Sequence, residues 1–247
     1  MLLALLDACA SAPPPAWGQW IWTPADAAIY RDLREDHPGI VAGVLVAELR
    51  YDGTVTTALR ESPSRGGEAP AIVIRLDDSL HAIWDGREDA AVAHAVGERL
   101  AAILRMAPRH REIQLDYDCP VRLLPRWAAV LGLLNGGVLQ GETVWITSLL
   151  AHLREPAYGA LFRGKIAGHI LQVFDTGEAP ADAATVARLA AAADVPYRLG
   201  IAAFERGNDG VPITDHRGWF AAVGTACVSP RCEAVWVFPG GQPWEPE

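Results

Sequence analysis

The sequence has little lysine and no long apolar run, and each shortage excludes a class of protein. Lys165 is the only lysine among 21 Lys and Arg residues, which face 30 Asp and Glu residues and leave a formal charge of −9. Sequence-independent nucleic-acid binding needs clustered cations that displace counterions, so we expect no nucleic-acid partner. No apolar run approaches the roughly 18 residues that cross a bilayer, so we expect no membrane span.

Cofactor and metal motifs are also missing. No Gly-x-Gly-x-x-Gly follows the first apolar run and no Walker loop is present, so no cofactor is expected. There is no Cys-x-x-Cys, and the seven histidines are scattered, which disfavours a structural zinc site. Cys227 and Cys232 are close enough for a turn to join them in an oxidising compartment, which leaves Cys119 as a small buried thiol.

The first 16 residues differ in composition from the rest. Residues 1–8 are mostly apolar and precede Cys9, like the end of a bacterial lipoprotein signal, which would make Cys9 a lipid anchor. There is no positively charged start, and Asp7 is unusual there, so a plain apolar tail remains the alternative. Ala10–Ala16 is a proline-rich linker in either case. We therefore expect a tail over 1–16, one domain over 17–247, and a periplasmic or outer-membrane-anchored protein.

Short apolar runs rich in β-branched and aromatic residues recur along the domain and predict strands buried on both faces. The predicted strands are Gln19–Trp22, Ile40–Leu49, Ala71–Leu76, Glu112–Asp118, Thr143–Ser148, Gly168–Phe174, Tyr197–Phe204 and Ala234–Phe238. Helical patterns between several of them predict helices over Ala25–Arg34, Ala90–Met106, Leu123–Leu134 and Ala181–Ala192.

This alternation predicts an α/β fold, a (β/α)8 TIM-type barrel with eight strands. The barrel should be irregular, because Asp52-Gly53 after the second strand favours a hairpin instead of a crossover helix. Only nine residues follow Phe238, so the last helix should be short or missing. A doubly wound open sheet is the alternative.

Active residues of barrel enzymes lie at the carboxyl ends of strands. The fourth predicted strand ends with Asp116 and Asp118, which alternation places on one face about 6.6 Å apart. Repulsion should raise the pKa of one of them, as suits a general acid, although Asp118 could instead cap a helix. Glu48 closes an apolar run and is either a second catalytic carboxylate or the partner of Arg75 in a buried ion pair. Arg75 could also bind an anionic sugar.

Other polar and aromatic residues on the predicted strands are candidates for substrate binding. Gln172 interrupts an apolar strand, and Thr147 is a weaker polar candidate. Trp22 and Trp236 lie on the first and last strands, which are neighbours in a closed barrel, so the two indoles could meet at the mouth and contact sugar rings. Filling of the core is the alternative for each. His169 starts its strand and is expected to be structural.

Several of these segments resemble one family. Gln19–Pro24, Val46–Leu49, Ile113–Pro120, Ile146–Leu149 and Leu171–Val173 are similar to blocks of an uncharacterised bacterial family, domain of unknown function 3142. The resemblance implies a glycoside-hydrolase-like barrel in an exported protein, without an established reaction. Asp116-x-Asp118 is also similar to chitinase-like glycosidases, whose acid is a glutamate two residues further on. Pro120 occupies that position here, so the usual acid is missing.

Three functions follow as hypotheses. The first is an exported glycosidase-like hydrolase in which Asp118 is general acid or base, Asp116 orients it or stabilises charge, and Glu48 is a second carboxylate. The second is a saccharide-binding lipoprotein without turnover, which Pro120 favours. The third is a metal-dependent hydrolase with oxygen ligands from Glu48, Asp116 and Asp118, with His169 as a possible addition.

Overall fold

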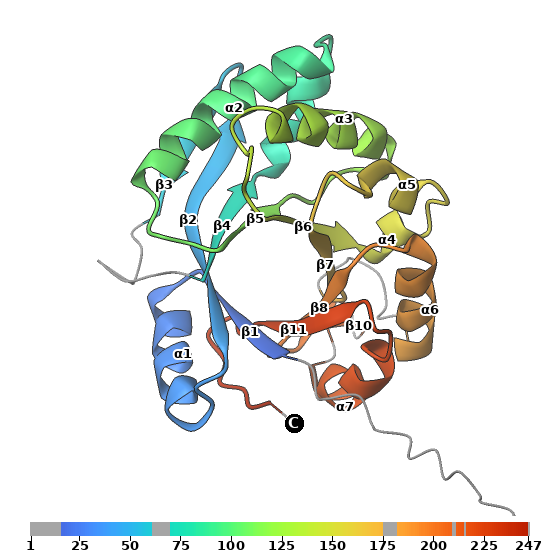
Figure 1. Cartoon of the computed structure of the whole chain (residues 1–247). Helices are drawn as coiled ribbons and strands as arrows, with labels where there is room; N and C mark the ends of the chain where they lie inside the picture. The colour runs from blue at the N-terminus through green and yellow to red at the C-terminus, as the bar shows by residue number, and fades with distance from the viewer. Residues whose placement is uncertain (1–15, 61–69, 175–181, 209–210, 215, 247) are drawn as a thin grey trace, which may run out of the picture.

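Eight parallel strands close into a barrel in a computed structural model that describes residues 16–60, 70–174, 182–208, 211–214 and 216–246 (Figure 1). β1 pairs with both β2 and β11, which closes the sheet on itself. The predicted (β/α)8 barrel is therefore confirmed. The barrel strands are β1 (Ala16–Ile21), β2 (Val41–Tyr51), β4 (Ala71–Leu76), β5 (Glu112–Asp116), β6 (Val144–Leu149), β7 (Gly168–Gln172), β8 (Tyr197–Ala202) and β11 (Cys232–Phe238).

Helices cover the outside of the barrel (Figure 1). All four predicted helices are present, as α1 (Pro24–Asp36), α2 (Asp89–Met106), α3 (Leu124–Asn135) and α6 (Ala183–Ala193). The sequence patterns did not predict the short helices α4 (Leu150–Leu153) and α5 (Tyr158–Phe162), the 3-10 helices η1 (Asp78–Trp84) and η2 (Val121–Leu123), or α7 (His216–Ala226). α7 contains Gly218 and Gly224, which weaken its helical signal, and it packs against α6 and β8.

The two predicted irregularities are also present. β2 turns at Asp52-Gly53 into the antiparallel strand β3 (Val55–Leu59), and Gly53 has a φ of 99°, which favours glycine. A second hairpin, β9 (Arg206–Asn208) and β10 (Val211–Thr214), precedes α7. Residues 239–246 after β11 contain no helix.

The predicted tail lies outside the described residues except for Ala16, which already belongs to β1 and not to a linker. Cys227 and Cys232 form a disulfide with a Cα–Cα distance of 5.3 Å, and Cys119 is a buried free thiol, as expected. Within the described part of the chain, no helix has the length and apolar character that a membrane crossing requires.

Tryptophans fill the middle of the barrel. Trp236 is 1% exposed and its ring lies over two glycines, since a Cβ at Gly18 or Gly43 would come within 2.7 or 2.5 Å of it. This position corrects the prediction that Trp236 meets Trp22 at the mouth. Inward-facing residues of β11 alternate, so Trp236 occupies the middle layer where the glycines leave space, and Phe238 reaches the mouth.

A hydrogen-bonded chain runs through the barrel interior. Nε1 of Trp20 donates to Oε1 of Gln114 at 2.8 Å, and Nε2 of Gln114 donates to Oε1 of Glu112 at 2.9 Å. Arg198 donates to both carboxylate oxygens of Glu112, and its guanidinium lies 3.6 Å from the Trp145 ring centroid. These hydrogen bonds hold the indole of Trp20 in place, although Nε of Arg198 is buried without a partner among the described residues.

Candidate functional site

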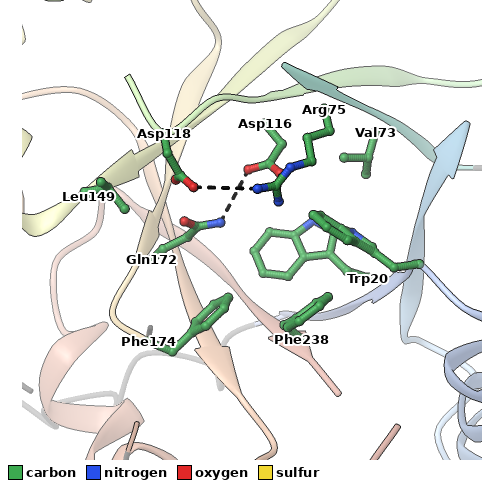
Figure 2. A pocket seen from close by; sticks show the side chains of 10 residues that line it. Trp20, Val73, Arg75, Asp116, Asp118, Leu149, Gln172, Phe174 and Phe238 are labelled. Carbon is green, nitrogen blue, oxygen red and sulfur yellow. Dashed lines mark hydrogen bonds and ion pairs between the residues drawn. The ribbon is translucent and has the colours of Figure 1, made fainter. Parts of the chain in front are cut away.

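A cavity of about 250 Å³ opens at the carboxyl ends of the barrel strands (Figure 2). It brings together five residues that the sequence singled out and five that it did not. The predicted residues are Trp22, Arg75, Asp116, Asp118 and Gln172. The residues missed are Trp20, Val73, Leu149, Phe174 and Phe238. Phe174 and Phe238 are the last residues of two predicted strands, and a position at the carboxyl end of a barrel strand could have identified them as candidates.

One wall of the cavity is polar. Nη1 of Arg75 lies 3.5 Å from Oδ2 of Asp116, and Nη2 lies 4.0 Å from Oδ2 of Asp118. Nε2 of Gln172 donates to Oδ1 of Asp116 at 3.5 Å (Figure 2). The interior-facing ends of β4, β5 and β7 therefore converge on one carboxylate pair, because paired residues of neighbouring parallel strands face the same side.

The other wall is aromatic. The rings of Phe174 and Phe238 stack at 5.7 Å and 9°, and Trp22 meets Phe238 edge-on at 5.1 Å. Trp20 lies 6.4 Å from Phe238. The Arg75 guanidinium is 5.2 Å from the Trp22 ring centroid, so this one side chain touches both walls.

Asp116 is the carboxyl group whose protonation the site alters most. Burial, together with the charge of Asp118, raises the pKa of Asp116 to about 6, although the Arg75 guanidinium acts in the opposite direction. The predicted rise within the aspartate pair thus falls on Asp116, which is 4% exposed, and not on the residue expected to be the acid. A carboxyl that titrates near neutral pH in a cavity suits proton transfer.

Two histidines hold the segment that carries Asp118. Nε2 of His81, on η1, lies 3.1 Å from the carbonyl oxygen of Asp118, and Nε2 of His152, on α4, lies 2.7 Å from that of Cys119. Nδ1 of His152 accepts from the Leu149 N–H at 3.1 Å, so its proton sits on Nε2. Burial lowers the pKa of His152, which keeps this neutral form. No sequence motif predicts this pair, because its contacts come from loops after two different strands.

Thr147 does not line the cavity. Its Oγ1 accepts from the Tyr117 N–H at 2.9 Å and also hydrogen-bonds the Asp116 side chain. The pairing of β5 with β6 ends before Tyr117, so the Tyr117 N–H has no partner in the sheet and donates to Thr147 instead. Thr147 thereby supports the aspartates, and the expected substrate contact is corrected to a contact with the protein.

Glu48 does not line the cavity either. Its carboxylate is held by Nε of Arg50 at 2.5 Å and by Nη2 of Arg60 at 2.7 Å. Burial alone would raise the pKa of Glu48, but the hydrogen bonds from Arg60 and Arg50 hold it below its usual value. Glu48 is thus ion-paired with Arg50 and Arg60. The predicted partner Arg75 is its neighbour in the strand register but does not pair with it.

The ligands that the third hypothesis, a metal-dependent hydrolase, would need are not assembled among the described residues. His169 is fully buried, and its Nδ1 lies 2.6 Å from Oγ of Ser148, among the rings of Tyr158 and Tyr197. Burial lowers the pKa of His169 to about 3. No group of three or more His, Cys, Asp or Glu side chains within the described ranges has the arrangement of a metal site.

Cys119 and Pro120, which directly follow Asp118, do not supply an acid or a nucleophile to the cavity. Burial raises the pKa of the Cys119 thiol to about 12, so the thiol is protonated and a poor nucleophile. Its Sγ lies 3.5 Å from the carbonyl oxygen of Pro120. Pro120 has no proton to donate, so proton transfer at this wall of the cavity rests on Asp116 and Asp118.

The fold is similar to that of glycosidases. A GH18 chitinase from Pseudoalteromonas aurantia matches with a TM-score of 0.62 and 9% identity, over 92% of this chain and 94% of that chain. A fungal endo-β-N-acetylglucosaminidase from glycosyl hydrolase family 18 matches with a TM-score of 0.59 and 12% identity, over 91% and 90%.

The spore cortex-lytic enzyme SleL of Bacillus cereus matches with a TM-score of 0.52 and 14% identity over 87% of this chain, which spans 58% of the length of SleL. Neither the family models nor the curated proteins include a match. At these identities the likeness establishes the fold alone, a (β/α)8 barrel. The resemblance to domain of unknown function 3142 stays a prediction.

Proposed function

We propose that the protein acts on a carbohydrate in the cavity at the barrel mouth, as a glycosidase-like hydrolase. The observation that carries the proposal is the pairing of an aromatic wall with a carboxylate, arginine and amide wall in one cavity. Sugar rings have apolar faces and polar edges, and such a cavity offers a partner for each. The glycosidase-like fold of the structural neighbours supports the same class of ligand.

In this proposal Asp118 is the general acid or base, because its side chain is 39% exposed and the more accessible of the two carboxyls. Asp116 orients it or stabilises positive charge at the anomeric carbon, and its raised pKa keeps a proton available near pH 6. Arg75 limits the repulsion between the two carboxyls. The bond between the anomeric carbon and the glycosidic oxygen breaks, and the oxygen takes up a proton from the carboxylic acid. A water molecule supplies the hydroxyl group that bonds to the anomeric carbon and returns a proton to the carboxylate.

The test is release of reducing ends from a panel of bacterial and plant polysaccharides. Wild type should release them, and Asp118→Asn should not. Asp32→Asn is the matched control, since Asp32 is exposed on α1, away from the barrel mouth. Release that persists in Asp118→Asn would refute the assignment of the residue and keep the class of enzyme.

Saccharide binding without turnover is the second candidate, and two observations favour it. The resemblance to chitinase-like glycosidases implies that Pro120 occupies the position of their acid, and Glu48 is held by two arginines outside the cavity. Hydrolysis ordinarily uses two carboxyls that flank the bond, about 5 to 9.5 Å apart, whereas Asp116 and Asp118 lie on one wall. Saturable binding of one glycan with no release by wild type would establish this candidate.

The proposed location is outside the cytoplasm, in the periplasm or anchored to the outer membrane by a lipid on Cys9. The disulfide between Cys227 and Cys232 supports an oxidising compartment. Mass spectrometry of the protein from a membrane fraction would test the anchor, since diacylation of Cys9 adds a defined mass and an unmodified amino-terminal segment does not.

A further inference from the structure

A second cavity lies at the opposite end of the barrel from the proposed saccharide site. Because all eight strands are parallel, their amino ends gather at one end, and this cavity of about 630 Å³ is lined by residues that precede or begin β2, β4, β5 and β6. Val41, Pro70, Arg109, Arg111 and Glu142 are among them. We call it the basal groove.

The basal groove is positively charged in an acidic protein. Arg109 and Arg111 are exposed, and neither forms an ion pair with any residue of the described chain. Glu142 faces Nε2 of His110 at 3.5 Å, and the nearby Glu112 is occupied by Arg198. Among the described lining residues, two arginine charges therefore face the single carboxylate of Glu142, in a chain with a net charge of −9.

The end of α2 extends this surface. Arg105 is exposed in the last turn of α2, and Met106 beside it is 67% exposed, the largest exposure among the big apolar residues of α2. Each arginine near an anionic bilayer is attracted by its surface potential, and an apolar side chain beside the arginines can enter the boundary between headgroups and acyl chains. Guanidinium groups match phosphate oxygens in a bidentate geometry.

The position of the groove agrees with such a role. β1 begins at Ala16 at the same end of the barrel, so the segment that contains Cys9 joins the domain there. The carboxyl ends of the strands, with Asp118 and Trp22, lie at the other end. A membrane at the basal groove would leave the mouth of the barrel open to a polymeric saccharide.

We propose that the basal groove docks the protein on anionic phospholipid headgroups, with Arg109 and Arg111 on the phosphates and Met106 at the lipid boundary. This docking does not depend on hydrolysis at the mouth. It supplies an orientation that a lipid on Cys9 alone would not, since a single flexible anchor leaves the barrel free to rotate.

The test is sedimentation of the full chain with vesicles, in a Cys9→Ala background so that no acyl chain forms. Wild type should sediment with vesicles that contain phosphatidylglycerol and not with pure phosphatidylcholine, and salt should release it. Arg109→Gln with Arg111→Gln should partition about 30-fold more weakly, because each arginine near an anionic surface contributes roughly a fivefold factor.

The matched control is Arg31→Gln with Arg188→Gln, which removes the same charge from exposed sites on α1 and α6. It should bind as the background protein does. Equal losses in both double variants, equal binding to neutral vesicles, or no binding to anionic vesicles would each overturn the proposal. Binding of inorganic phosphate that requires Arg109 and Arg111, without binding to anionic vesicles, would also overturn the proposal, in favour of a soluble anion as the ligand.

Discussion

Nη1 of Arg75 lies 3.5 Å from Oδ2 of Asp116, and the two residues are direct partners in the register of β4 and β5. The guanidinium lowers the pKa of Asp116, but burial and the charge of Asp118 raise it by more, so that the pKa is about 6. A proton on Asp116 in slightly acidic solution is therefore a property of this strand pairing.

The first prediction concerns stability and pH. Asp116 titrates near 3.9 in the unfolded chain and near 6 in the folded one, so the folded state binds the proton more tightly. The stability that this protonation adds to the folded state is present below the unfolded pKa, near pH 4, and is lost as the pH rises through 6. Between pH 4 and 7, the free energy of unfolding of wild type should fall by about 2 kcal/mol relative to that of Asp116→Asn.

Urea unfolding across this pH range measures the difference, with Asp32→Asn as the control that should follow wild type. Parallel curves for wild type and Asp116→Asn would mean that the carboxyl has an ordinary pKa. The proposed supply of a proton at the cavity would then lose its support.

The second prediction concerns the histidines beneath Asp118. His152→Ala would leave the Leu149 N–H and the Cys119 carbonyl without their partner in a buried site, and should cost about 3 kcal/mol of stability. His94→Ala, on the exposed face of α2, should change stability by less than about 0.5 kcal/mol.

Glycan affinity of the folded fraction separates positioning from stability. It should fall in His152→Ala, because the backbone that carries Asp118 loses a hydrogen bond, and in the milder variant His81→Ala for the same reason. Unchanged affinity in both variants would show that the histidines serve stability alone.

The third prediction concerns the tryptophan layer. A methyl group at Gly43 would lie 2.5 Å from the Trp236 ring and 3.1 Å from Trp20, so Gly43→Ala should destabilise the barrel by about 2 kcal/mol or more. Gly39→Ala, with no atom within 4 Å, is the control and should be nearly neutral. Thermal unfolding compares them, and equal melting temperatures would contradict the packing described here.

The sequence predicted the barrel well because its signals are local. Buried parallel strands are continuous apolar runs, and the Asp52-Gly53 turn is a short-range signal, so both are readable without tertiary structure. α7 was missed because its glycines obscure a helix that packing against β8 stabilises.

The site was predicted only where strand alternation decides it. Asp116, Asp118, Arg75 and Gln172 face one cavity because each sits at an inward position near a strand end. Glu48 could not be placed, because a register shift between Leu45 and Ala47 and the hairpin that brings Arg60 alongside are tertiary features.

The sequence also could not predict how far from the barrel mouth each inward-facing aromatic residue lies. Trp236 and Phe238 have the same inward direction, and the choice of which one reaches the mouth depends on how far β11 extends relative to β1 and β8. Gly18 and Gly43 decide it by leaving space for an indole in the middle layer.

The most direct test of the account is calorimetric titration with the saccharide that the polysaccharide panel identifies, in the Asp118→Asn background so that nothing is cleaved. Trp22→Ala removes part of the aromatic wall and should weaken binding about tenfold or more. Trp17→Ala, on β1 and packed against Phe220 and Trp244, should leave the affinity of the folded protein unchanged. Equal affinities for the two variants would place the saccharide elsewhere and contradict the account.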